Sequence, residues 1–328
     1  MISDLTVTEE SFDSLALLQS DPKSSLDWNL VFTLPAWLKV WWQNFGAGAD
    51  LYLRAVRQNG QILGIAPLQI RKGTASIVGS VNVCDYQDLI IAPGRERDFY
   101  QAVLDDLLKR KITRLHLETI RPDSSIVKHL MPLAQERRYK IDYRQADVSS
   151  DMRLPVEWED YLIILDGKQR HELKRKIRNL DEAIVTNFRT IANPESLLPA
   201  TEDFLKLFPE SRGDKAEFMT AKMQTYFRSL AAALAESGVL RYGSLELNGK
   251  PIAMVMYFDY LDNYYLYNSA YDPAYRLLSV GLISKALCIQ DGIEKGKKRF
   301  DFLKGPEVYK SHLGGHEIPL YSCEISLE

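Results

Sequence analysis

Apolar residues follow two different spacings along the first part of the chain, and these spacings predict both helices and strands. Spacings of three and four residues predict an aromatic-rich helix, with Pro35 in its first turn. Looser alternation on both sides of Asn59-Gly60 predicts a β-hairpin, because this dipeptide tolerates the positive φ of a type I′ turn. The apolar stripe of the helix is Leu34, Trp37, Leu38, Trp41 and Phe45. The other elements expected here are strands Leu51–Gln58 and Gln61–Ile70, a further strand region up to Ile91, helix Phe99–Leu108 and strand Thr113–Glu118.

The second part of the chain repeats the same order of elements. A second Asn-Gly turn, at Asn248-Gly249, lies 189 residues after the first, and the last strands of the two series are offset by 185 residues. Shared order at a nearly constant offset predicts a tandem duplication. The expected elements are strands Leu240–Leu247, Pro251–Phe258 and Asp262–Ala270, helix Leu282–Lys295 and strand Arg299–Leu303.

The chain between the two series is predicted to be helical, at Arg170–Glu182, Phe204–Phe208 and Glu217–Ala235. We therefore expect an α/β (α+β) fold of two modules, each a mixed, mainly antiparallel sheet flanked by helices. The first module is expected at residues 1–150. The second is expected at residues 151–328, including the helical region 168–235.

Composition narrows the class of protein. With 328 residues, 46% hydrophobic and 26% charged, the chain is neither disordered nor a disulfide scaffold. A net charge of −3 gives no overall attraction to DNA. Three cysteines far apart in sequence have no metal-ligand spacing, so no metal is expected. The start lacks the features of a signal peptide, and the apolar runs are far too short to cross a membrane, which predicts a cytoplasmic protein.

The segment Tyr271–Gly281 carries the sharpest local signal. It follows a predicted strand and precedes an amphipathic helix, and it contains the small residues Ser279 and Gly281. Such a turn exposes backbone N–H groups at the positive end of a helix dipole, which binds phosphate. We expect the N–H groups of Ser279, Val280, Gly281 and Leu282 to point at one anion, with Arg276 adding a charge. The alternative is a helix capped by Ser279 without a ligand.

The pattern Arg276-x-x-Ser279-x-Gly281 resembles the loop of GNAT acyltransferases that holds the pyrophosphate of coenzyme A, although Ser279 replaces the usual first glycine. Further motifs make the chain similar to the CelD/BioF-like acetyltransferases, which are tandem GNAT proteins related to the FemABX peptidyltransferases. These motifs are Phe32-x-x-Pro35-x-Trp37, Gly64-Ile65-Ala66-Pro67-Leu68, Asp85-Tyr86-x-Asp88, Arg170-x-x-x-Lys174-Arg175-Lys176, Ala270-Tyr271-Asp272-Pro273 and Asp301-Phe302-Leu303-Lys304-Gly305-x-Glu307-x-Tyr309-Lys310. The resemblance implies two GNAT-like modules, of which only the second keeps a cofactor site.

Acyl transfer to an amine requires a proton acceptor, stabilisation of the developing oxyanion, and a proton for the thiolate. Asp301 is the candidate base, or else it braces the turn at Lys304-Gly305. The resemblance places a general acid at Tyr309, which is otherwise a buried structural tyrosine. It implies that Lys310 stabilises negative charge; the alternative is a solvated lysine.

Two further groups are candidates for acceptor binding. Strand alternation puts Tyr265 and Tyr267 on one face of a tyrosine-rich strand, which suits a sugar or peptide, although strand propensity explains tyrosines equally well. Arg170, Lys174 and Arg178 share one face of a basic helix, which suits a phosphorylated acceptor, a sugar nucleotide or a tRNA. The alternative for this helix is an ordinary solvated face.

The expected function is N-acyl transfer from acetyl-CoA or another acyl-CoA to an amine on a small molecule or a cell-envelope precursor, including a sugar or polysaccharide precursor. One alternative is FemABX-like transfer from aminoacyl-tRNA, which the basic helix favours and the phosphate-binding loop disfavours. Another is a non-catalytic accessory protein of polysaccharide synthesis. The sequence does not identify the acyl group, the acceptor or the oligomeric state.

Overall fold

The computed structural model describes residues 5–328, which fold into two compact units. The first unit extends to Val148 and also contains Ile318–Glu328, and the second is Ser149–Glu317. The division therefore differs from the expected one at the C-terminus, where the last strand returns to the first unit instead of completing the second. No helix in the described part of the chain is long and apolar enough to cross a membrane.

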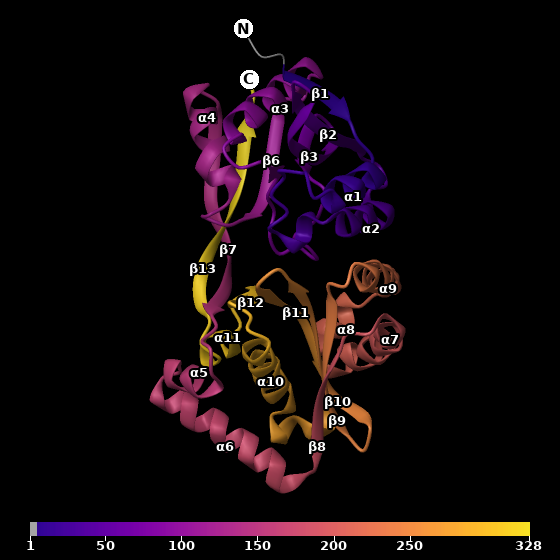
Figure 1. The fold of residues 1–328 in the computed structure, drawn as a ribbon, viewed down its shortest axis with the longest axis vertical. Coiled ribbons are helices and arrows are strands. Elements are labelled where there is room, and N and C mark those ends of the chain that lie inside the picture. Colours follow the sequence, from indigo (N-terminus) through magenta and orange to yellow (C-terminus); the bar gives the residue numbers. More distant parts are fainter. Residues whose placement is uncertain (1–4) are drawn as a thin grey trace. The chain divides into compact units, whose positions relative to one another are not determined.

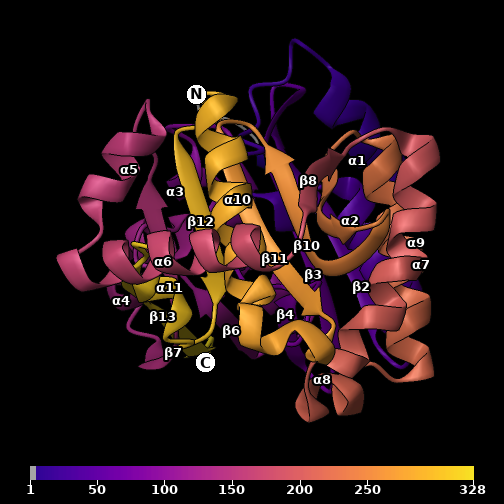
Figure 2. The same ribbon diagram turned by 90° about the horizontal axis from the view of Figure 1, so that it is seen from below.

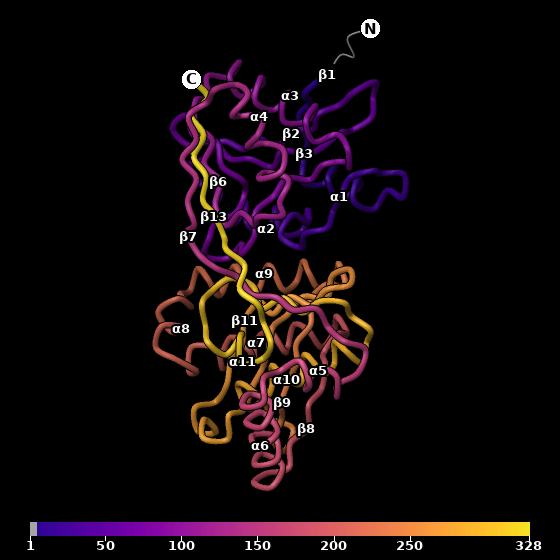
Figure 3. The backbone as a smooth tube through the Cα atoms, turned by 90° about the vertical axis from the view of Figure 1, so that its left-hand side faces the viewer, coloured from indigo at the N-terminus to yellow at the C-terminus, as the bar shows by residue number. Residues whose placement is uncertain are grey.

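The sheet of the first unit follows the order β1-β2-β3-β4-β6-β13, with β7 beside β13. Neighbouring strands from β1 to β13 are antiparallel except for the parallel pair β4 and β6. Figure 3 shows β7 and β13 side by side, and the rings of Tyr143 and Tyr321 stack 4.5 Å apart there. The strands are β1 (Leu5–Glu9), β2 (Asp50–Gln58), β3 (Gln61–Arg71), β4 (Thr74–Ile77), β5 (Ile90–Ile91, paired with β3), β6 (Arg114–Ile120), β7 (Lys140–Arg153) and β13 (His316–Ser326).

Helices pack on this sheet and bury the hydrophobic core of the unit. The aromatic stripe predicted near Pro35 forms helix α2, with Pro35 at the start, and it buries Trp37 completely. Helix α3 supplies Phe99 and Leu107 to the main core of the unit. The helices are α1 (Phe12–Ser20), α2 (Pro35–Phe45), α3 (Glu96–Lys109) and α4 (Met131–Glu136), with a 3-10 turn at Val31–Thr33 and a π turn at Ile126–Leu130.

The sheet of the second unit follows the order β8-β9-β10-β11-β12, with the end of β7 next to β12. Again all neighbours are antiparallel except one pair, β11 and β12. The two units thus repeat one pattern. When the six strands of each unit are counted from β1 or from β8 along the sheet, the fourth and fifth strands are parallel and the other described neighbours are antiparallel. The strands are β8 (Thr186–Ile191), β9 (Leu240–Leu247), β10 (Lys250–Tyr260), β11 (Asn263–Tyr271) and β12 (Arg299–Lys304).

Helices lie on both faces of the second sheet, with α6 and α10 on one side and α7 and α9 on the other (Figures 1 and 2). Tyr264 points to the first side, where its hydroxyl donates to Asp291 of α10, and Tyr267 points to the other, against Phe227 of α9. The helices are α5 (Trp158–Ile164), α6 (Gly167–Ala183), α7 (Pro194–Ser211), α8 (Gly213–Phe218), α9 (Ala221–Glu236), α10 (Val280–Glu294), α11 (Tyr309–His312) and the 3-10 helix η3 (Pro273–Leu278).

The predicted hairpins are confirmed in both units. Asn59 and Asn248 each have a φ of 51°, and the glycines that follow also have positive φ, as a type I′ turn requires. The predicted mixed, mainly antiparallel α/β fold is likewise confirmed. Matching strand order in the two units is the result expected for a duplicated module.

Candidate acyl-transfer site

The site begins where the parallel strands β11 and β12 separate. They pair only over Asn263–Tyr265 and Arg299–Asp301. Beyond this point β11 continues along β10, and Leu303 and Lys304 of β12 pair with Ser150 and Ser149 of β7. The two strands therefore stop pairing after Tyr265 and Asp301. In a sheet with parallel strands, ligands bind at such a point.

The chain leaves β11 through η3 and enters α10 with an unusual backbone. Ser279 has a φ of 56° and a ψ of 29°, the left-handed conformation that normally favours glycine. Its side chain forms no cap hydrogen bond to the helix. The left-handed residue explains why related loops carry glycine here. The simple alternative, a serine that caps α10 with its side chain, does not describe this geometry.

Two of the four predicted N–H groups are available to a ligand. The Ser279 N–H donates to the Arg276 carbonyl oxygen at 3.0 Å, and the Leu282 N–H donates to the Ser279 carbonyl oxygen at 2.9 Å. The N–H groups of Val280 and Gly281 make no hydrogen bond within the described residues. Arg276 itself is exposed on η3.

Gly281 has a packing role that the sequence did not reveal. A Cβ atom placed on Gly281 would lie 2.9 Å from Cδ1 of Tyr271. The end of β11 therefore packs directly on the first turn of α10. A side chain at position 281 would disturb this packing before it met any ligand.

Lys176, on the basic helix α6, reaches the same loop. Its Nζ donates a hydrogen bond to the Ser279 hydroxyl oxygen at 2.8 Å and lies 3.3 Å from Oε1 of Glu172. The basic helix thus contributes to the loop, but through Lys176 rather than through the three residues predicted to bind an acceptor. A charge-assisted donor beside two free N–H groups is an arrangement that can bind an anion.

Arg170, Lys174 and Arg178 lie elsewhere on α6. Lys174 and Arg178 are exposed, and they line a groove of about 500 Å³ between α5 and α6. Asp181 and Glu182 line the same groove, and the Arg178 guanidinium lies 3.8 Å from Glu182. This groove therefore carries both signs of charge.

Asp301 and Lys310 both bind the backbone at the C-terminal end of β12. The Asp301 carboxylate is 3% exposed and accepts a hydrogen bond from the Leu303 N–H at 2.8 Å. Lys310 is 2% exposed, and its ammonium donates to the carbonyl oxygens of Leu303, Lys304 and Gly305 at 2.7–2.9 Å. It also lies 3.0 Å from a carboxylate oxygen of Glu307.

Tyr265 and Tyr267 lie in the protein interior, at 5% and 9% exposure. The Tyr265 hydroxyl accepts a hydrogen bond from Asn263, and Tyr267 packs between Phe227 and Phe258. They share a face of β11, as predicted. Their packing against neighbouring side chains matches the strand-propensity alternative.

A buried lysine on α10 was not among the predicted site residues. Lys285 is 7% exposed, donates to the Gly281 carbonyl oxygen at 2.6 Å, and has its Nζ 4.8 Å from the Tyr309 ring centre. Burial, reinforced by the charge of Lys215, lowers the pKa of Lys285 to about 7. Its sequence position was informative, because it interrupts the apolar stripe of Leu282 and Ile289.

Lys215 of α8 adds a second cation to this region. Its ammonium donates to the Ser269 carbonyl oxygen on β11 and lies 4.8 Å from the Phe208 ring centre. Burial, followed by the charge of Arg212, lowers the pKa of Lys215 to about 8. Neither Lys215 nor Lys285 forms an ion pair with a carboxylate among the residues described. No group of metal-ligating side chains occurs in that part of the chain either.

Comparisons with known proteins agree with this fold. Residues 167–311 match the family model for the acetyltransferase (GNAT) domain. No curated protein matches the chain in sequence. Among solved structures, FemX is similar over 97% of this chain and 96% of its own, with a TM-score of 0.64 and 12% identity.

Two further structures show the same fold. One is the C-terminal domain (DUF2156) of a putative lysylphosphatidylglycerol synthetase from Agrobacterium fabrum, with a TM-score of 0.57, 10% identity, and coverage of 85% of this chain and 83% of that one. The other is L-PGS from Bacillus licheniformis, with a TM-score of 0.54, 12% identity, and coverage of 87% and 90%. Residues 167–311 thus match a GNAT acetyltransferase domain, and the fold of the chain is similar to that of FemX.

Proposed function

We propose that the protein transfers an acyl group from an acyl-CoA, such as acetyl-CoA, to an amine on a small molecule or a cell-envelope precursor. The observation that carries the proposal is the anion-binding arrangement at the start of α10. There the free N–H groups of Val280 and Gly281 lie beside the Ser279–Lys176 hydrogen bond. A pyrophosphate carries the charge that this arrangement favours.

The donor's reactive end would occupy the space where β11 and β12 separate. A thioester held there would lie near the ends of both strands, close to the loop that Asp301 and Lys310 stabilise. Binding at this point would hold donor and acceptor together, which lowers the barrier to their reaction. Arg276 is placed to add one exposed charge to the phosphate contacts.

We assign proton acceptance to Lys285 and proton donation to Tyr309. A lysine with a pKa of about 7 is largely neutral at slightly alkaline pH and can accept the proton that the attacking amine loses. A carbon–nitrogen bond then forms as the carbon–sulfur bond breaks, and the Tyr309 hydroxyl gives a proton to the departing thiolate. Asp301 and Lys310 act as positioning residues, because their polar atoms are engaged by the backbone.

Calorimetric titration with coenzyme A and acetyl-CoA tests the donor. We expect both to bind the full chain, and we expect mass spectrometry of amine mixtures to find an acylated product. A folded protein that binds neither compound would contradict the proposal.

The second candidate is transfer from an aminoacyl-tRNA. The exposed cations of α6, which include Lys174, Arg175 and Arg178, favour it, because such a face attracts a phosphate backbone. The arrangement at α10 disfavours it. Salt-dependent binding of tRNA without binding of coenzyme A would support this candidate over the first.

A further inference from the structure

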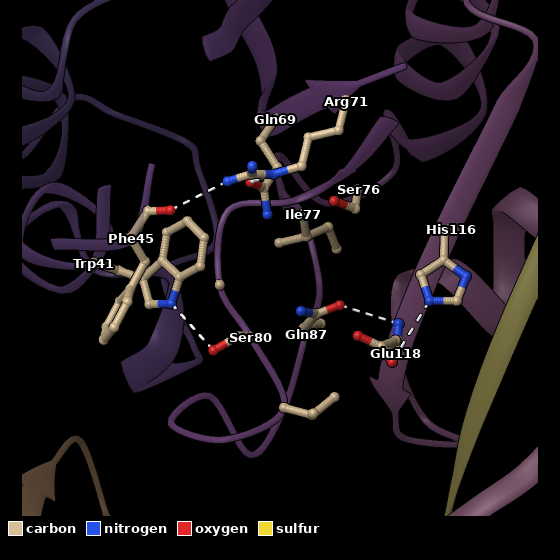
Figure 4. Close-up of a pocket in the computed structure, with 12 residues that line it drawn as sticks. Trp41, Phe45, Gln69, Arg71, Ser76, Ile77, Ser80, Gln87, His116 and Glu118 are labelled. Carbon is tan, nitrogen blue, oxygen red and sulfur yellow. Dashed lines mark hydrogen bonds and ion pairs between the residues drawn. The ribbon is translucent and has the colours of Figure 1, made fainter. Parts of the chain in front are cut away.

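A pocket of about 260 Å³ lies in the first unit, away from the residues assigned above (Figure 4). Helix α2, strands β3, β4 and β6 and the segment 79–87 line it. This volume lies just below the range of about 300–1,000 Å³ that is typical of ligand pockets. The pocket is therefore suited to a small metabolite rather than a large cofactor.

Three side chains on one side of this pocket present hydrogen-bond donors. The Gln69 carbonyl oxygen accepts from Arg71 at 3.4 Å, and the Gln87 carbonyl oxygen accepts from the Glu118 N–H at 3.1 Å. Figure 4 shows the amide nitrogen of Gln69 pointing into the pocket and that of Gln87 pointing toward Ser80. Because the Ser80 oxygen accepts from the Trp41 indole at 3.4 Å, its O–H remains to donate.

These donors select a ligand rich in acceptor oxygens. Gln69 and Gln87 are only 7% and 6% exposed, and their amide nitrogens make no hydrogen bond within the described chain. An amide nitrogen to which no protein group is bonded can donate to a ligand oxygen. Arg71 adds positive charge, since its guanidinium is held beside the pocket by the carbonyl oxygens of Phe45 and Gln69. A carboxylate is a ligand group that such donors and a nearby positive charge favour.

The pocket also contains a carboxylate. Glu118 on β6 lies beside Gln87, and one of its carboxylate oxygens is 3.5 Å from the His116 ring nitrogen (Figure 4). This carboxylate can accept hydrogen bonds from an ammonium group.

The remaining walls of the pocket are apolar. Trp41, Phe45, Ile77 and Val81 provide them. Trp41 and Phe45 belong to the aromatic stripe of α2, and their rings lie 5.7 Å apart. An apolar wall next to hydrogen-bond donors and a carboxylate suits a zwitterion with an apolar side chain.

We propose that this pocket binds a free amino acid with an apolar side chain. The carboxylate is recognised by Gln69, Gln87 and Ser80, the ammonium by Glu118, and the side chain by Trp41 and Phe45. The inference goes beyond the proposed function and does not rest on it. Binding itself can be measured without any acyl donor.

Saturation-transfer NMR on the full chain tests the ligand class with four probes. We expect L-leucine to bind. N-acetyl-L-leucine lacks the ammonium and L-leucinamide lacks the carboxylate, so each should bind at least about tenfold more weakly. Equal binding of the three, or no binding of leucine, would overturn the proposal. So would tighter binding of D-glucosamine than of leucine, which would indicate a sugar site.

Three variants then locate the site. Gln69→Leu removes the amide at nearly constant volume and should weaken leucine binding about tenfold. Glu118→Gln should weaken the binding of leucine but not of N-acetyl-L-leucine. Gln135→Leu makes the same chemical change at an exposed position on α4 and should bind leucine like the parent.

Unchanged binding in a folded Gln69→Leu or Glu118→Gln protein would overturn the assignment. Coenzyme A titration of the same samples separates this result from the proposed function, since that titration reports only on the loop before α10.

Discussion

Lys176 donates a hydrogen bond of 2.8 Å from its ammonium to the hydroxyl oxygen of Ser279, the left-handed residue that precedes α10. This contact joins α6 to the loop between η3 and α10. The lysine also lies 3.3 Å from Glu172, which holds it in place on α6. The anion-binding arrangement is therefore built from residues more than one hundred positions apart in the chain.

We expect Lys176→Met to weaken coenzyme A binding about tenfold, because one charge-assisted hydrogen bond to a phosphate is removed. Calorimetric titration measures the effect. Lys168→Met makes the same change at an exposed position of the same helix and should leave the affinity unchanged. Equal affinities of the two variants would remove Lys176 from the site.

Gly281 offers a test of packing against Tyr271. A Cβ at Gly281 would meet the ring at 2.9 Å, so we expect Gly281→Ala to lower the free energy of unfolding by about 1–3 kcal/mol. In a Tyr271→Ala background the same change should cost much less, because the ring is gone. Urea unfolding of the four proteins gives the coupling energy. Additive costs would show that the ring is not the obstacle.

Much of the fold could be predicted from the sequence because it depends on local signals. The turns at Asn59-Gly60 and Asn248-Gly249 could be predicted because Asn and Gly readily adopt positive φ. The repeat could be predicted from the shared order of elements. The predicted helix at Phe204–Phe208 was too short, since α7 continues through Pro199 and Pro209. Tertiary packing of Phe204 and Leu205 outweighs the cost of those prolines.

The candidate site was less predictable because it depends on contacts between distant segments. The motif identified Ser279 and Gly281, but not that Tyr271 packs on Gly281. Nor could spacing show that Lys310 is surrounded by three carbonyl oxygens. The return of Ile318–Glu328 to the first unit is a long-range pairing that no local pattern records.

The lowered pKa of Lys285 predicts how stability changes with pH. Between the native value of about 7 and the ordinary value of 10.5, the unfolded chain binds a proton that the native chain does not. The free energy of unfolding contributed by this group therefore rises with pH across that range, by up to about 1.4 kcal/mol per pH unit. Lys285→Met should lose this rise.

Urea unfolding at pH 7.5 and pH 9.5 measures the difference between parent and variant. Lys215 contributes in the same direction in both proteins, so the comparison isolates Lys285. Identical changes with pH would mean that Lys285 keeps an ordinary pKa.

Tyr309→Phe separates the tyrosine's ring from its hydroxyl. The ring that faces the Lys285 ammonium at 4.8 Å remains, so we expect the protein to fold and to bind coenzyme A like the parent. If the hydroxyl protonates the thiolate, kcat should fall about 10²–10⁴-fold. Steady-state kinetics with a thiol-detecting reagent measures it. An unchanged kcat would assign Tyr309 a packing role only.

Two substitutions of Asp301 show whether this residue is a catalytic base or a positioning residue. Asparagine keeps an oxygen that can accept from the Leu303 N–H, whereas alanine removes it. Because we assign Asp301 to positioning, we expect Asp301→Asn to keep most of the activity. Asp301→Ala should leave the buried Leu303 N–H unsatisfied and lower the free energy of unfolding by about 1–3 kcal/mol. Loss of activity in both variants, with Asp301→Asn as stable as the parent, would instead make the carboxylate the base and return Lys285 to a structural role.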